Sequence, residues 1–136
     1  MEKIDLFTLV RHTGPYESWP LKTELIEQGK ATGKKVPGFV LEAQYRHSAG
    51  YLLVTSWDCP FEEAQTFLLL SPRLDVLFKK TVGAPYASIW MESHEIVDES
   101  TVLFHCDGDL DIRASVRSAR KLKLEQFDRQ SGKRFP

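Results

Sequence analysis

The sequence predicts a mainly β fold: an antiparallel meander of about eight or nine strands that forms a sandwich or barrel, with one N-terminal helix that places it at the margin of α+β. Three observations predict it. Apolar and polar residues alternate in the chain that follows Gly38. Turn-forming residues (Gly, Pro, Asp and Ser) separate the alternating segments at short intervals. The length of 136 residues and the 42% hydrophobic content suffice for one core. Short connections favour antiparallel neighbours. We place a single domain at residues 1–127 and a polar C-terminal tail at residues 128–136.

The segment before Gly38 contains the first strand and the helix. Residues 4–10 are β-branched and aromatic, which predicts a strand that Gly14-Pro15 ends. Residues 18–31 are predicted as the helix, because Ser18 suits the N-cap position. The apolar residues on one face of this helix are Leu21, Leu25 and Ile26.

The chain after Gly38 has a period of two. Asp107-Gly108 predicts a two-residue hairpin turn of type I′, whose two central positions need positive φ. The strands expected on either side of this and the other turns cover residues 39–46, 51–57, 66–70, 74–81, 86–97, 102–106, 110–116 and 122–127.

Charge and hydropathy exclude several classes of protein. Eighteen basic and 19 acidic residues give a formal net charge of -1, so the balance predicts no binding to nucleic acid or to an anionic membrane. No run approaches the roughly 18 apolar residues of a membrane span, and Asp5 interrupts the first apolar run, which is unlike a signal peptide. We therefore expect a cytoplasmic protein, with Cys59 and Cys106 as reduced thiols.

The end of the first strand carries the most suggestive motif. Leu9-Val10-Arg11-His12 resembles the Arg-His-Gly motif at the end of the first strand in the histidine phosphatase family. The resemblance implies a hydrolase in which His12 attacks phosphorus, Arg11 binds the phosphate oxygens and His94 completes the pocket. Three further segments resemble that family: residues 20–25, Ser71-Pro72 with Lys80-Thr81, and Ser93-His94.

Several residues depart from the phosphatase pattern. Thr13 stands where the family has Gly, and Arg73 comes too early after Ser71-Pro72 to replace a phosphate-binding Arg. The family has a parallel sheet with helices on both faces, whereas this chain has a strand period after Gly38. The phosphatase function is therefore the alternative hypothesis. The simpler interpretation is that Arg11 and His12 are half-exposed residues at the end of a strand, with no catalytic role.

Metal and cofactor sites are not expected. The run from Asp107 to Asp111 resembles the start of a calcium loop, but Ile112 and Ser118 occupy the positions of its essential Gly and Glu. We therefore expect a hairpin turn whose Asp109 and Asp111 face water. The two cysteines and His105 lack the spacing of a zinc site.

The segment from Trp57 to Glu63 is the most distinctive loop. It joins two apolar strands, and its aromatic and acidic residues are of the kind found in binding loops on rigid sheets. Alternatively, the aromatic residues cap the core and the acids are simply solvated. The binding residues predicted here are Trp57, Asp58, Phe61, Glu62 and Glu63.

The preferred hypothesis is a small non-enzymatic domain that needs no cofactor and acts on a protein partner or as a homo-oligomer. One concrete form is an inhibitor of the immunity-protein type. The alternative is the phosphatase-like hydrolase with His12, Arg11 and His94. A third reading is a small-molecule carrier that holds a ligand inside a closed meander.

Overall fold

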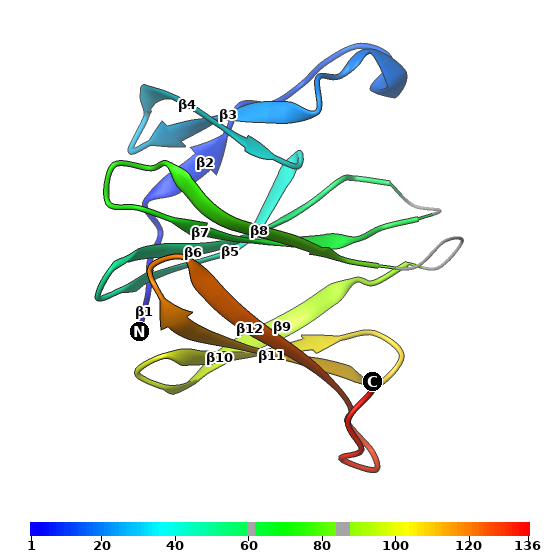
Figure 1. The fold of residues 1–136 in the computed structure, drawn as a ribbon. Helices are drawn as coiled ribbons and strands as arrows, with labels where there is room; N and C mark the ends of the chain where they lie inside the picture. Colours follow the sequence, from blue (N-terminus) through cyan, green and yellow to red (C-terminus); the bar gives the residue numbers. More distant parts are fainter. Residues whose placement is uncertain (60–61, 84–87) are drawn as a thin grey trace.

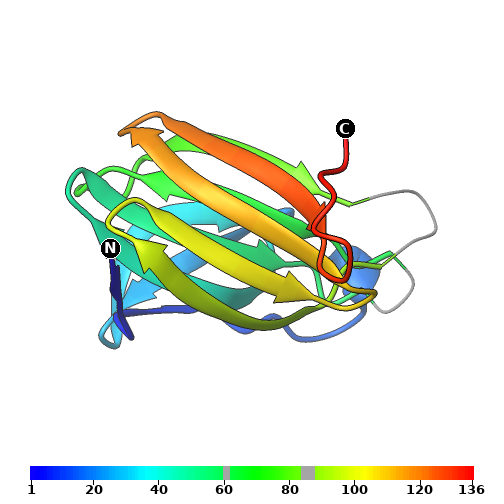
Figure 2. The ribbon, with the colours of Figure 1, turned by 90° about the horizontal axis from the view of Figure 1, so that it is seen from below.

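A computed structural model describes residues 1–59, 62–83 and 88–136, and it shows three antiparallel sheets stacked in layers (Figure 1). The mainly β, antiparallel prediction is confirmed. The central sheet has the order β1-β5-β6-β7-β8 and is covered on one face by a four-stranded sheet, β12-β11-β10-β9, and on the other by a three-stranded sheet, β2-β3-β4. Figure 2 shows the four-stranded sheet lying over the central sheet, with the two termini at opposite ends of the molecule.

The strands have the following bounds. The central sheet contains β1 (Glu2–Lys3), β5 (Val40–His47), β6 (Gly50–Ser56), β7 (Gln65–Leu70) and β8 (Val76–Val82). The four-stranded sheet contains β9 (Met91–Asp98), β10 (Thr101–Cys106), β11 (Leu110–Ser118) and β12 (Lys121–Asp128). The three-stranded sheet contains β2 (Phe7–Leu9), β3 (Lys22–Glu27) and β4 (Lys30–Pro37), and one 3-10 turn, η1 (Tyr16–Ser18), precedes β3.

Both faces of the central sheet are buried, because each covering sheet supplies an apolar face. Tyr45 and Phe67 point toward the four-stranded sheet, where they meet Phe104. Leu53 and Leu68 point the other way, toward the three-stranded sheet. Each of these side chains is 1% exposed or less, so the space in which a carrier would hold its ligand is filled by side chains.

The helix predicted at residues 18–31 is wrong. Lys22–Glu27 and Lys30–Pro37 instead form the hairpin β3–β4, in which Gln28 and Gly29 make the turn with φ of 47° and 80°. The supposed helical face has only Leu25 in the core, whereas Leu21 is 76% exposed. Turn chemistry and pairing with β2 therefore outweigh a spacing of four and five that is too sparse to define a helix.

The hairpin predicted between β10 and β11 is present, but its centre lies one residue later. Gly108 and Asp109 have positive φ, of 65° and 60°, and the N–H of Leu110 donates to the carbonyl oxygen of Asp107 at 3.4 Å. The pairing of His105 with Asp111 fixes this register. A type I′ turn needs positive φ at both central residues, and here Asp109 supplies the second.

The start of one expected strand and the C-terminal tail differ from the predictions. The strand expected at residues 86–97 begins at Met91, and residues 84–87 lie outside the described part of the chain. The tail after β12 turns back on that strand, since the Phe135 N–H donates to the carbonyl of Gln126 at 2.8 Å. Within the described residues, no helix is long and apolar enough to cross a membrane.

Candidate functional site

Five ring side chains from three separate segments meet beside η1, at one end of the central sheet. We call this group the aromatic cluster; Figure 1 shows η1 beyond the three-stranded sheet. Trp57 lies on the same face of the central sheet as Leu53, because alternate residues of a strand share a face. The members of the cluster are His12, Tyr16, Trp19, Phe39 and Trp57.

Phe39 stands at the centre of the aromatic cluster. The other four rings surround it edge-to-face, with centroid distances between 5.1 and 5.6 Å and interplanar angles between 80° and 87°. Edge-to-face contacts of this kind contribute roughly 0.5–1.5 kcal/mol each beyond the area that they bury. Tyr16 nevertheless remains 41% exposed, so the cluster presents aromatic surface to solvent.

Hydrogen bonds fix the segments that carry these rings. The Tyr16 hydroxyl donates to the carbonyl oxygen of Trp57 at 2.5 Å, and the indole N–H of Trp57 donates to Thr66 Oγ1 at 3.2 Å. The indole N–H of Trp19 is shared between the carbonyls of Thr13 and Gly14, at 3.2 and 3.3 Å. The segment around η1 is therefore attached to the loop after β6.

Glu63 organises that loop from within. Its side chain is 1% exposed, and one carboxylate oxygen accepts the N–H groups of Trp57 at 2.7 Å and Ala64 at 3.1 Å. The other oxygen accepts the N–H of Cys59 at 2.9 Å. Glu63 is thus a buried structural anchor of the loop, and its predicted role in binding stays a prediction.

The other predicted binding residues have different positions. Asp58 and Glu62 are exposed, and Asp58 has a positive φ of 52°. Trp57 is half-buried within the aromatic cluster, and Phe61 lies outside the described residues. Burial, followed by the charges of Cys59, Glu63 and Asp58, raises the pKa of Tyr16.

His12 has a packing role in the aromatic cluster. The Thr23 hydroxyl donates to the carbonyl of Gly38 at 2.6 Å and is 2.8 Å from His12 Nε2, so that nitrogen carries the proton and donates to Thr23. The ring also packs against Trp19 and Phe39. Arg11 is exposed beside it.

His94 lies on the opposite side of the central sheet. It belongs to β9, its ring packs against Phe104, and its Nδ1 is hydrogen-bonded to the hydroxyl of Tyr45. Tyr45 is part of the core between the central and four-stranded sheets, whereas His12 contacts β3 of the three-stranded sheet. The structure therefore does not bring His94 together with Arg11 and His12.

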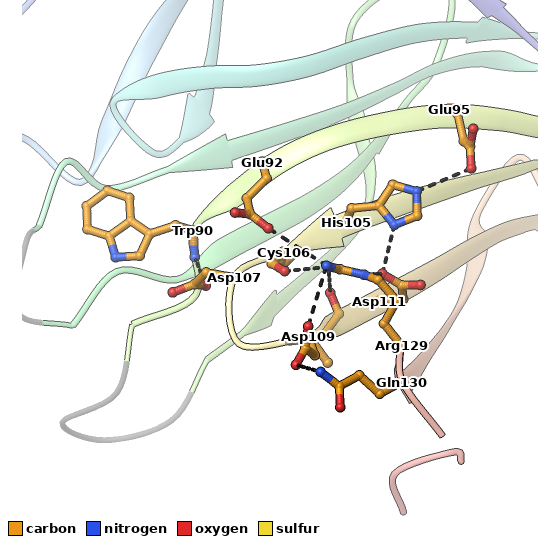
Figure 3. Close-up of polar contacts among 11 residues, drawn as sticks. Trp90, Glu92, Glu95, His105, Cys106, Asp107, Asp109, Asp111, Arg129 and Gln130 are labelled. Atoms are coloured by element: carbon orange, nitrogen blue, oxygen red, sulfur yellow. Dashed lines mark hydrogen bonds and ion pairs between the residues drawn. The ribbon is translucent and has the colours of Figure 1, made fainter. Parts of the chain in front are cut away.

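The outer face of the four-stranded sheet carries a charged network that sequence reasoning missed (Figure 3). His105 Nδ1 lies 2.8 Å from Asp111 and its Nε2 lies 3.2 Å from Glu95. Arg129 donates from Nε to Asp111 at 2.8 Å and from Nη2 to the carbonyl of Cys106 at 2.6 Å. The side chain of Asp111 is only 13% exposed, so the expectation that it faces water is wrong.

The network shifts the pKa values of its members in opposite directions. The hydrogen bond to Asp111 is the largest cause that raises the pKa of His105. Burial raises the pKa of Asp111, but the bonds from Arg129 and His105 outweigh burial, and its pKa lies below the usual value. The sequence did contain a signal for this network. His105 and Asp111 stand on the two strands on either side of the predicted turn, and both belong to the same face of the hairpin.

The described residues contain no group of three or more His, Cys, Asp or Glu side chains placed to hold a metal ion. Both cysteines are free thiols, as expected. Cys106 is buried, and burial is the main cause that raises its pKa to about 12. This thiol therefore stays protonated and unreactive near neutral pH.

No protein-family model, curated protein or solved structure matches this chain.

Proposed function

We propose that the protein is a non-enzymatic interaction domain that binds another protein through the aromatic cluster and the adjoining loop. The observation that carries this proposal is the convergence of five rings at one end of a rigid sheet, with Tyr16 still 41% exposed. Tyr and Trp are the residues most enriched at the energetic centres of protein interfaces. The fixed positions of these rings reduce the entropy lost when a partner binds.

The partner that suits this surface is basic. Glu17, Asp58 and Glu62 are exposed around the cluster, and the carboxylates of Asp58 and Glu63 raise the pKa of Tyr16 after burial. A protein that presents Lys or Arg side chains gains charge complementarity there, and cation–π contact with the rings.

A second copy of the chain suits this surface less well. A two-fold contact places the same patch on both subunits, so Glu17 and Asp58 would face their own copies. Like charges opposed in an interface are unfavourable. We therefore favour a different protein over a homodimer, and sedimentation velocity at several concentrations distinguishes the two.

Photo-crosslinking tests the proposal. A benzoylphenylalanine replaces Tyr16 in one protein and Phe135 in a control; both residues are exposed aromatics, at 41% and 46%. In extract from the source cells, a partner crosslinked from position 16 but not from position 135 supports the proposal. Crosslinks that are the same from both positions, or none from position 16, overturn it.

A charge-reversal pair tests the electrostatic part. Glu17→Lys should weaken the crosslink from position 16 and reduce its dependence on salt, whereas Glu99→Lys, at an exposed turn between β9 and β10, should not. The immunity-type form of the proposal makes one further requirement. The captured partner must be an enzyme that loses activity when the domain binds it.

A further inference from the structure

An open groove runs between β5 of the central sheet and β9 of the four-stranded sheet. Two adjoining hollows of about 320 and 420 Å³ make up this groove, and both are lined by Lys3, Glu42 and His94. Strand β1 pairs with β5 only at Tyr45 and Arg46, so the preceding part of β5 borders the groove. His94, which lines both hollows, lies on the opposite side of the central sheet from the aromatic cluster.

His94 is held in one orientation at this groove. Its ring packs edge-to-face on Tyr45 at 5.4 Å and tilted against Phe104 at 5.8 Å. Burial raises the pKa of Tyr45 to about 12, so the phenol keeps its proton. Its hydroxyl has no other acceptor among the described residues, so it donates to Nδ1 of His94. The neutral ring therefore carries its own proton on Nε2.

Two donors at the groove have no acceptor among the described residues. His94 makes its hydrogen bond through Nδ1, and within the described part of the chain nothing accepts from Nε2. Lys3 likewise has no ion-pair partner there, and its charge is near enough to help lower the pKa of His94, after burial. Three carboxylates also line the groove: Glu42 accepts the hydroxyl of Ser56 at 2.7 Å, Glu92 lies 4.0 Å from Arg129, and Asp5 is exposed.

We propose that this groove binds a carboxylate group, which accepts hydrogen bonds from the Lys3 ammonium and from His94 Nε2–H. Both donors are free, and a carboxylate has two oxygens that can accept one bond each. The charges of Asp5, Glu42 and Glu92 at the border of the groove disfavour a doubly charged anion, so the site should prefer a carboxylate to phosphate or sulfate.

The pH dependence of binding follows from the groups that face His94. These are Lys3 from β1, Asp5 just after it, Glu42 and Tyr45 from β5, and Glu92 on the same strand. A bound carboxylate favours the imidazolium form and therefore raises the pKa of His94. Affinity should increase as pH falls through the pKa of His94 in the bound state.

Titration with acetate tests the proposal on the full chain. Ring-nitrogen NMR of the four histidines is followed at pH 6.5 as sodium acetate replaces sodium chloride at constant ionic strength. We expect a saturable shift at His94 alone, with a raised pKa. The variant Lys3→Gln should weaken binding about tenfold, the usual order for loss of one charge-assisted bond, whereas Lys30→Gln on β4 should not change it.

Tyr45→Phe tests the positioning role of the phenol. Without the hydroxyl, the proton of neutral His94 can move to Nδ1, so the ring-nitrogen shifts should show a mixed tautomer and acetate should bind more weakly. A capped peptide with one central glutamate distinguishes a side chain from a free acid. If the peptide shifts His94 at lower concentration than acetate, the source is a polypeptide; if acetate is the better ligand, it is a small acid.

Three outcomes overturn the proposal. The first is no saturable shift at His94, and the second is an equal response in Lys3→Gln and wild type. The third is phosphate binding as tightly as acetate, which would indicate unselective attraction of anions. This proposal is independent of the proposed protein-binding function. We therefore expect Glu17→Lys, which changes the aromatic-cluster surface, to leave acetate binding unchanged.

Discussion

Tyr16 and Trp57, which are 41 positions apart, are joined by a hydrogen bond from the phenol to the backbone carbonyl at 2.5 Å. Tyr16→Phe keeps the ring and removes this bond. We expect the free energy of unfolding to fall by about 0.5–1.5 kcal/mol and amide exchange around η1 to accelerate. Urea denaturation and hydrogen exchange measure these changes. Tyr51→Phe is the control, because the Tyr51 hydroxyl has no partner among the described residues; equal effects of both changes would contradict the prediction.

Glu63→Gln should destabilise the protein by about 2 kcal/mol or more. The glutamine side chain keeps only one of the two oxygens that accept backbone N–H groups. Its amide nitrogen replaces the other oxygen and is itself a donor, so it faces backbone N–H donors that it cannot accept. Denaturant unfolding of this variant is compared with Glu99→Gln, a change at an exposed turn that should be close to neutral. A Glu63→Gln protein as stable as wild type would show that water replaces the lost acceptor.

Gly50→Ala should be among the most damaging single changes, with a loss of about 3 kcal/mol or more. Gly50 has a φ of 145°, and an added Cβ would lie 2.0 Å from the carbonyl oxygen of Leu70. Gly29→Ala provides the contrast, because nothing lies within 4 Å of its Cβ and only its φ of 80° is unfavourable, at about 1–2 kcal/mol. Thermal unfolding of both variants separates the steric cost from the backbone cost.

The network of His105, Asp111 and Arg129 should stabilise the fold in a defined pH window. The raised pKa of His105 gives stability that is present below its usual value near 6.5 and is lost as pH rises through the folded value. The lowered pKa of Asp111 gives stability that is present above its usual value near 3.8 and is lost as pH falls through the folded value. His105→Gln should therefore be more destabilising at pH 6 than at pH 8.5 in urea unfolding, and an equal effect at both would refute this.

The chain after Gly38 could be predicted because its strands alternate cleanly or are wholly apolar, and because turn residues separate them. The segment before Gly38 could not be predicted, because the spacing of Leu21, Leu25 and Ile26 fits the helical period and the strand period about equally well. Pairing with β2 settles that choice, and pairing is a long-range event. The turn chemistry of Gln28-Gly29 was the available local signal.

The candidate site was only partly visible in the sequence. The acids and aromatics after β6 indicated a binding loop, but the burial of Glu63 depends on three backbone N–H groups that converge only in the folded loop. The aromatic cluster joins segments around Tyr16, Phe39 and Trp57, and nothing local to any one of them predicts that meeting. His94, in contrast, stands on a different sheet from the motif with which it was grouped.

Strand β7 sends Phe67 into one apolar layer and Leu68 into the other. A cavity made at either position weakens the same backbone, and that backbone supports both layers. The layers therefore cannot melt independently, although they share no side chain. Calorimetry should therefore record one cooperative transition. A destabilising substitution in the small three-stranded sheet should lower the thermal midpoint of the whole molecule.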